Sequence, residues 1–284
     1  MYRAKERGGA RTHLFDVAIR ERAVDALSIE LELRQGLEHG ELRLFYQPLV
    51  SLESGEMVGA EALIRWEHPE HGLLSPDKFL PVAEESGLIV AVGAWAVGEA
   101  CRRLRDRDRR NGGPSEFGLA VNLSARELTH PDVVSTVLSA VRRSALDPSR
   151  LTIEVTESTA MADRDSGFRA LHELNDAGVR IAIDDFGTGY SSLDHLREMP
   201  ADILKIDRSF VAGMAANSPD SALVAAAIAV GRALELEVVA EGIETSEQVA
   251  DLRELGCPLG QGFLFARPLP PAELDGLLET DAQF

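Results

Sequence analysis

Residues 151–156 read Leu-Thr-Ile-Glu-Val-Thr, and the alternation in this stretch determines how the rest of the chain is interpreted. Successive side chains of a strand point to opposite faces of its sheet. Ile153 and Val155 therefore share an apolar face, while Glu154 shares the other face with two threonines. The pattern predicts a strand that packs one face against helices and carries a carboxylate on the face toward the interior of the fold.

Seven further stretches along the chain have the same strand-like character. Helical segments separate most of them, and strands that alternate with helices pair in parallel. Eight strands in a chain of 284 residues favour a closed barrel, which commonly takes about 250 residues. The predicted strands are Leu42–Val50, Met57–Trp66, Phe117–Leu123, Leu151–Thr156, Val179–Asp184, Ile203–Ile206, Glu237–Ala240 and Leu259–Phe263.

The first two of these strands break the parallel pattern. Only Ser51–Glu56 joins them, whereas a parallel crossover needs about a dozen residues or more. This pair should therefore form an antiparallel hairpin. We predict an α/β fold, a modified TIM (β/α)8 barrel with one antiparallel strand, in which the long link from the second to the third strand holds two helices.

The charge of the chain limits its partners. There are 47 acidic and 29 basic residues, which gives a formal net charge of -18. A field of that sign repels a phosphate backbone, so we expect no nucleic acid polymer as a partner. A small anionic substrate stays compatible if metal ions or a few basic side chains reverse the sign locally. Solubility alone is the alternative explanation of the charge.

Cysteine usage and hydropathy indicate the compartment. Cys101 and Cys257 are the two cysteines, and they form no CxxC spacing, which argues against a cysteine-based zinc site. No apolar run approaches the roughly 20 residues that span a bilayer. Residues 1–9 are polar and charged, unlike the core of a signal peptide. We expect a cytoplasmic fragment without a membrane segment, and leave open a membrane anchor elsewhere in the full-length protein.

Polar side chains gather where the predicted strands end. In barrels of this kind the active site lies at the carboxyl ends of the strands. Any one of these side chains has a plainer explanation, as a solvent-facing residue or a turn cap. Their convergence on one rim favours a metal site, because interior carboxylates are costly unless they are paired or bind metal. The residues are Glu61, Asn122, Glu154, Asp184, Asp185, Lys205, Asp207, Glu241 and Gln261.

The residue types at this rim indicate a reaction class. Carboxylate and amide oxygens suit Mg²⁺ or Mn²⁺. Two such ions, about 3.5–4 Å apart, clamp the attacking and leaving oxygens in phosphodiester cleavage. Lys205 is suited to orienting or deprotonating the attacking water, or to stabilising charge on the phosphate. Arg65 shares a strand face with Glu61 and suits a phosphate oxygen. Residues 185–192 contain two glycines and form either a mobile lid or an ordinary tight connection.

Several short motifs in this chain resemble those of the EAL-domain cyclic di-GMP phosphodiesterases. They occur in the order of that family and with consistent spacing, from about residue 29 to residue 275, and the departures from the family pattern are mild. The motifs are Tyr46–Pro48, Glu61–Trp66, Asn122–Ser124, Glu154–Glu157, Asp184–Leu193, Lys205–Asp207, Ala240–Glu244 and Gln261–Phe263.

This resemblance implies hydrolysis of cyclic di-GMP to linear 5'-pGpG at two Mg²⁺ or Mn²⁺ ions. The implied ligands are Glu61, Asn122, Glu154 and Asp184 for one ion, and Asp184, Asp185 and Glu241 for the other. The implied catalytic residues are Lys205, Glu241 and Asp185, and the general base is left unassigned. The implied substrate contacts are Gln47, Glu61, Leu63, Arg65, Asp207 and Gln261. Glu157 and Glu244 are implied to fix the loop after the fifth strand.

The N-terminus carries a second resemblance. Residues 1–8 resemble the last helix of a GGDEF diguanylate cyclase domain, although a chance charged helix is the alternative. The interpretation is a GGDEF remnant and linker at residues 1–28 and an EAL phosphodiesterase domain at residues 29–284. The resemblance implies a homodimer, and a GGDEF domain with or without a sensor domain upstream in the full-length protein.

Two competing functions remain at this point. The first is an EAL-type receptor that binds cyclic di-GMP without efficient turnover. The filled metal positions argue against it, and turnover with Mg²⁺ discriminates the two. The second is an unrelated metal-dependent barrel enzyme that acts on another small anion, which selective nucleotide binding would separate.

Overall fold

The computed structural model describes residues 26–188, 193–214, 218–280 and 283–284 of the chain. These residues separate into two units. The first combines the chain up to Arg43 with Arg65–Ile89, and the second combines Leu44–Ile64 with Val90–Phe284. The second unit contains most of the barrel and all the metal ligands predicted from the sequence.

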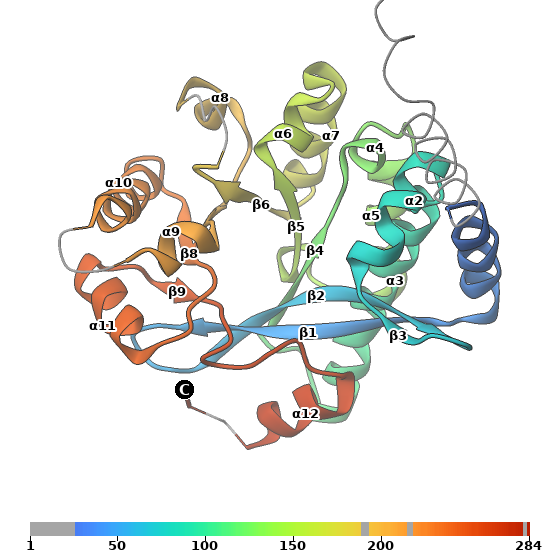
Figure 1. The fold of residues 1–284 in the computed structure, drawn as a ribbon, viewed down its shortest axis with the longest axis horizontal. Coiled ribbons are helices and arrows are strands. Elements are labelled where there is room, and N and C mark those ends of the chain that lie inside the picture. The colour runs from blue at the N-terminus through green and yellow to red at the C-terminus, as the bar shows by residue number, and fades with distance from the viewer. Residues whose placement is uncertain (1–25, 189–192, 215–217, 281–282) are drawn as a thin grey trace, which may run out of the picture. The chain divides into compact units, whose positions relative to one another are not determined.

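Nine strands form one sheet in the order β1-β9-β8-β7-β6-β5-β4-β2-β3, and a further pairing of β1 with β2 closes eight of them into a barrel (Figure 1). The strands are β1 (Leu42–Ser51), β2 (Met57–His68), β3 (Gly72–Leu74), β4 (Gly118–Asn122), β5 (Leu151–Thr156), β6 (Arg180–Phe186), β7 (Ile203–Ile206), β8 (Glu237–Ala240) and β9 (Leu259–Gly260). The predicted eight-stranded barrel is confirmed, and β3 is an addition that the sequence did not indicate.

Strand β1 is the reversed strand of the barrel. It pairs with β9 in antiparallel fashion, whereas every neighbouring pair from β2 and β4 round to β8 and β9 is parallel. The short connection after β1 is a tight turn, in which the Ser51 amide donates to the Glu56 carbonyl at 2.9 Å. The predicted antiparallel strand is therefore confirmed, and its cause is the connection length.

Helices of the second unit cover the outside of the barrel wall (Figure 1), and α2 belongs to the first unit. Ile153 and Val155 on β5 are fully buried in the large apolar cluster that β4, β5 and β6 form with the helices outside them, as the alternation in residues 151–156 predicted. The helices are α2 (Pro76–Ser86), α3 (Ile89–Asn111), α4 (Ala125–Leu128), α5 (Val133–Ser144), α6 (Glu157–Met161), α7 (Arg164–Asp176), α8 (Leu193–Glu198), α9 (Arg208–Ala212), α10 (Pro219–Ala233), α11 (Ser246–Leu255) and α12 (Pro271–Glu279). Helices α2 and α3 fill the link between the second and third predicted strands, as expected.

The first unit has a small core of its own. Residues 26–39 form a helix. Strand β3 pairs with the end of β2, with Trp66 opposite Leu74. The Trp66 ring packs edge-on against Phe79 of α2 at 5.7 Å between centroids, and its indole N–H donates to Glu41 at 3.0 Å. This unit includes Arg65.

Two boundary predictions need comment. The eighth predicted strand ends too late, because β9 stops at Gly260 rather than Phe263. At Gly262 a Cβ atom would lie 2.0 Å from the Ile243 carbonyl oxygen, so the chain turns closely over that residue instead of continuing as a strand. The predicted boundary at residue 28 stays a prediction, because residues 1–25 lie outside the described part of the chain.

Candidate active site

Adjacent parallel strands place the first group of polar side chains together. Asn122, the last residue of β4, is the register partner of Glu154 on β5. Glu61 on β2 is the register partner of Ala120, two residues before Asn122. Since side chains two residues apart share a face, all three polar side chains point into the barrel at its carboxyl end. Glu61 and Glu154 are only 8% and 3% exposed.

Hydrogen bonds hold Glu61 on both of its oxygens. The Asn122 side-chain amide donates to Glu61 Oε1 at 2.7 Å, and the Gln261 amide donates to Glu61 Oε2 at 2.6 Å. Gln261 also donates to Gln47 Oε1 at 3.0 Å, and Gln47 donates to the carbonyl of Ala266 at 3.2 Å. This chain of amides fixes one side of the site before any ligand arrives.

Lys205 on β7 stands at the centre of the site, 2% exposed. Its ammonium nitrogen lies 2.9 Å from Glu154 Oε2 and 2.6 Å from Glu241 Oε1. It also lies 3.5 Å from Asp184 Oδ1 and 3.7 Å from Glu61 Oε2. One buried cation therefore shares four carboxylates, all of which the sequence predicted for this rim.

The ionisation of this cluster follows from burial and charge. Burial alone would lower the pKa of Lys205, but the four carboxylates outweigh it and raise that pKa well above its ordinary value. Burial raises the pKa of Glu154 well above its ordinary value, and the attraction of Lys205 only partly offsets this effect. Burial likewise raises the pKa of Glu241 to about 7. In contrast, Lys205 and the amides of Gln261 and Asn122 overcome burial at Glu61 and lower its pKa. The cluster thus carries more negative charge than one lysine neutralises.

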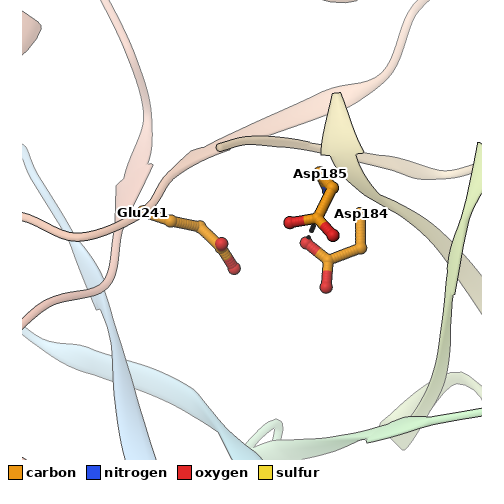
Figure 2. Close-up of side chains that lie close together, drawn as sticks. All are labelled: Asp184, Asp185 and Glu241. Carbon is orange, nitrogen blue, oxygen red and sulfur yellow. Dashed lines mark hydrogen bonds between the residues drawn. The ribbon is translucent and has the colours of Figure 1, made fainter. Parts of the chain in front are cut away.

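Strand β6 delivers two neighbouring aspartates to one side by departing from regular geometry. Its register with β7 shifts between Ile183 and Phe186, and Asp185 has a left-handed backbone with φ of 54°. In a regular strand Asp184 and Asp185 would point to opposite faces. The bulge brings both carboxylates toward Glu241, as Figure 2 shows, and ligand atoms of the three residues lie within 4.8 Å of one another.

Glu241 is positioned by the turn that follows β8. Its amide donates to the Ile206 carbonyl at 3.1 Å, which continues the ladder with β7 by one residue. The next residue, Gly242, has φ of +70°, and a Cβ atom there would lie 2.4 Å from the Cβ of Arg208. Only glycine permits this close turn, so the sequence Glu-Gly at 241–242 directs the carboxylate back toward Lys205.

The donor set fits divalent cations. Asp184, Asp185 and Glu241 offer three carboxylates around one point. Glu61, Asn122 and Glu154 offer two further carboxylates near Lys205 and an amide that is hydrogen-bonded to Glu61. Oxygen ligands of this kind suit Mg²⁺ or Mn²⁺. Burial raises the pKa of Glu241 to about 7, although the Lys205 ammonium lies 2.6 Å away and acts to lower it. The grouped carboxylates of Asp184, Asp185 and Glu241 therefore fit a divalent cation.

Other predicted site residues have more specific surroundings. Asp207 caps α9, because its Oδ1 accepts a hydrogen bond from the Ser209 amide at 3.0 Å. Asp207 also contacts Asp185. Burial, and then the charges of Asp184 and Asp207, raise the pKa of Asp185. Glu157 lies at the start of α6, 3.9 Å from the imidazole of His195. His195, which the sequence did not single out, lines a cavity of about 340 Å³ with Glu157 and Asp184.

Glu244, Leu63 and Arg65 are further residues that the sequence predicted for the site. The side chain of Glu244 is exposed, and its amide donates to Gln248 at 2.8 Å. Leu63 is half-buried on β2. Arg65 belongs to the first unit, so its part in the site stays a prediction. Residues 189–192 of the predicted lid lie outside the described residues.

A parallel barrel with one reversed strand and an acidic, lysine-centred site at its carboxyl end defines a known class. The chain matches the EAL domain over residues 30–268 and belongs to that family. The bifunctional diguanylate cyclase/cyclic di-GMP phosphodiesterase MucR of Pseudomonas aeruginosa is 48% identical over 274 residues, which cover 96% of this chain and 40% of MucR. The cyclic di-GMP phosphodiesterase NbdA of the same organism is 42% identical over 280 residues, which cover 99% of this chain and 36% of NbdA.

A solved structure supports the same assignment. The MucR phosphodiesterase in complex with cyclic di-GMP matches with a TM-score of 0.81 at 50% identity, over 87% of this chain and 99% of that one. The chain thus corresponds to less than half of the two relatives named above. In the part of the chain that the structure describes, no helix has the length and apolar character needed to cross a membrane.

Proposed function

We propose that this chain hydrolyses cyclic di-GMP to linear 5'-pGpG in a metal-dependent reaction. The observation that carries the proposal is the buried Lys205 ammonium among four carboxylates, with Asp184, Asp185 and Glu241 grouped beside it. The names of MucR and NbdA, both cyclic di-GMP phosphodiesterases, support the choice of substrate.

Two sets of residues would hold the cations. Glu61, Asn122, Glu154 and Asp184 would surround one ion, and Asp184, Asp185 and Glu241 the other. When bound, Mg²⁺ or Mn²⁺ would neutralise phosphate charge and make the attacking water more acidic. The Asp184 carboxylate lies near Lys205 and also near the carboxylates of Asp185 and Glu241, which supports a position between the two ions.

The residues of the chain would then position the reactants. The carboxylates keep Lys205 protonated in this structure, because they raise its pKa, so its role is that of a hydrogen-bond donor to the attacking water or to a phosphate oxygen. Gln47 and Gln261 form one wall of the site, and their amides are oriented by each other and by Glu61. With Leu63, Arg65 and Asp207 they would contact the substrate. No residue is assigned as the general base.

A second candidate function is a receptor that binds cyclic di-GMP with slow turnover. The left-handed backbone at Asp185 favours keeping this candidate, because a small displacement of Asp184 or Asp185 would weaken metal binding while leaving the amide wall intact. Homodimer formation, the loop-fixing role of Glu157 and Glu244, and upstream GGDEF and sensor domains are also proposals, as is a cytoplasmic location.

Product analysis tests the proposed function. The purified chain is incubated with cyclic di-GMP and Mg²⁺ or Mn²⁺, and in parallel with EDTA, and products are separated by chromatography. We expect pGpG with metal, none with EDTA, and none from Glu61→Ala. The matched control Glu247→Gln alters an exposed carboxylate on α11 and should retain full activity. Tight binding without pGpG would favour the receptor, and absence of binding would overturn both candidates.

A further inference from the structure

The interior of the barrel is packed on one side only. On the side of β6 to β9 and β1, Ala182, Ile203, Val239 and Leu259 form a buried apolar cluster with Leu49 against it. On the side of β2, β4 and β5 the corresponding interior positions are small: Gly59, Gly118, Ala120 and Thr152. Barrels of this type normally fill this layer with bulky side chains. Small residues on three neighbouring strands therefore leave space.

That space is a cavity of about 730 Å³, which we call the interior shaft. Gly59, Gly118, Ala120 and Thr152 all line it. At one end it is lined by Glu61, Glu154, Lys205 and Gln261, the buried floor of the candidate active site. At the other end it is lined by Glu56, Ser115 and Glu116, which precede β2 and β4.

The outer end of the shaft lies at the amino-terminal ends of the strands, and the half-buried Leu277 and Leu278 of α12 also line the cavity. Glu56 and Glu116 at its outer end are exposed. Ala120 lies in the middle of a central barrel strand, yet it is half-buried rather than buried, so solvent reaches the barrel interior at its level. Thr152 and the charged floor provide polar partners, and a cavity of this size with such partners holds water.

The proposed reaction needs water to enter the active site and a proton to leave it while the substrate covers the site. Hydrolysis of one phosphodiester consumes one water: its oxygen bonds to phosphorus and the bond from phosphorus to the leaving oxygen breaks. One proton of the water goes to the leaving oxygen. The other is released, because the new phosphomonoester loses its second proton with a pKa of about 6. Substrate bound at the carboxyl ends of the strands would obstruct both movements on that face.

We propose that the interior shaft is a solvent route that joins the underside of Lys205, Glu154 and Glu61 to bulk water at the amino-terminal ends of the strands. It admits the water consumed in each turnover and carries away the released proton while substrate covers the opposite face. This inference rests on the proposed function. The residues that keep the route open are Gly59, Gly118, Ala120 and Thr152, none of which has a role in binding metal or substrate.

Thiol labelling of Ala120→Cys tests the route. The reagent is methyl methanethiosulfonate, which adds a small methylthio group. Ala182→Cys is the matched control, because Ala182 lies in the interior apolar cluster but does not line the shaft. Wild-type protein reports the background from Cys101 and Cys257, which are 0% and 3% exposed. Labelling is followed by mass spectrometry in EDTA, with and without cyclic di-GMP at a concentration that calorimetry shows to be saturating.

We expect the Ala120→Cys thiol to be labelled at a rate that changes less than twofold when cyclic di-GMP is bound. The labelled enzyme should lose at least tenfold in kcat, with KM and Mg²⁺ affinity unchanged, and dithiothreitol should restore kcat. Ala182→Cys and wild type should stay unlabelled. The route is overturned if the Ala120→Cys thiol is unreactive, if cyclic di-GMP protects it more than tenfold, or if the labelled enzyme keeps its kcat. Inactivity of unlabelled wild type would instead count against the proposed function, since labelling itself needs no turnover.

Discussion

The two halves of the candidate site are built in different ways. Glu61, Asn122 and Glu154 project from regular parallel strands, in register with their neighbours. Asp184 and Asp185 project from a register shift in β6, one of them with a left-handed backbone. The first half is held by hydrogen bonds between amides and carboxylates. The second half brings carboxylates together, where burial and, to a lesser extent, the charge of Asp184 raise the pKa of Asp185 and of Glu241.

The half with Glu61, Asn122 and Glu154 is therefore arranged before any ligand binds, whereas the half with Asp184 and Asp185 needs cations to offset the repulsion between its carboxylates. Regular strands position their side chains without ligand, because the barrel itself fixes them. Grouped carboxylates repel one another until positive charge arrives. We therefore expect changes in the first half to act on chemistry with little effect on stability, and changes in the second half to act on stability and metal binding together.

The largest expected effect is on turnover in the regular half. Glu154→Gln should lower kcat by about 10³-fold or more, roughly 4 kcal/mol, because a proposed metal ligand is lost. Glutamine keeps the size of the side chain, and three other carboxylates remain within 3.7 Å of the Lys205 ammonium. The free energy of unfolding in EDTA should change by less than about 1 kcal/mol. Kinetics and urea denaturation measure the two effects, and a large loss of stability would contradict the prediction.

Lys205 joins the two halves, and its removal should destabilise the metal-free protein. Lys205→Met leaves four carboxylates without their shared cation, and breaking a buried pair commonly costs about 3 kcal/mol or more. Denaturation in EDTA measures the loss, and added Mg²⁺ should recover part of it. Lys78→Met, which alters an exposed lysine on α2, is the matched control and should change stability by less than about 0.5 kcal/mol. Equal effects of the two substitutions would contradict the role of Lys205.

The same difference explains which features of the fold and of the site could be predicted from the sequence. The alternation in residues 151–156 placed Glu154 inside the barrel, and the short link Ser51–Glu56 identified the reversed strand. Both are local rules. The bulge at Asp185 and the one-sided packing of the barrel interior depend on how neighbouring strands align. The sequence of one segment alone does not determine that alignment. Likewise β3 is three residues long, too short to give a period, and His195 meets Glu157 only through the packing of α8 near α6.

The pH dependence of metal binding tests the second half. Burial raises the pKa of Glu241 to about 7, so the cation must displace a proton below that pH, and apparent affinity should fall up to about tenfold per pH unit. A carboxyl whose folded pKa is raised contributes stability that is present below the unfolded value of about 4.5 and lost as pH rises through about 7. The metal-free protein should thus lose stability over that window.

Calorimetric titrations with Mn²⁺ at pH 6.0 and 8.0 measure the affinity, and denaturation in EDTA from about pH 4.5 to about pH 7 measures the stability. Glu241→Gln removes the titrating group and is the control. It should bind Mn²⁺ more weakly at both values and show a smaller difference between them. An affinity in the unaltered protein that is equal at both pH values would show that Glu241 is ionised before the metal binds.

The smallest expected effect is a difference in stability between glycine and alanine substitutions, which reports the backbone conformation at Asp185 and at Asp184. At Asp185, φ of 54° disfavours a side chain, so Asp185→Gly should be more stable in EDTA than Asp185→Ala by about 1 kcal/mol. At Asp184, which has no such backbone, the order should reverse, and Asp184→Ala should be more stable than Asp184→Gly by about 0.5–1 kcal/mol. Both pairs lose one carboxylate, so charge cancels within each pair and the difference reports the backbone alone. A higher stability of the alanine variant at both positions would contradict the left-handed backbone at Asp185.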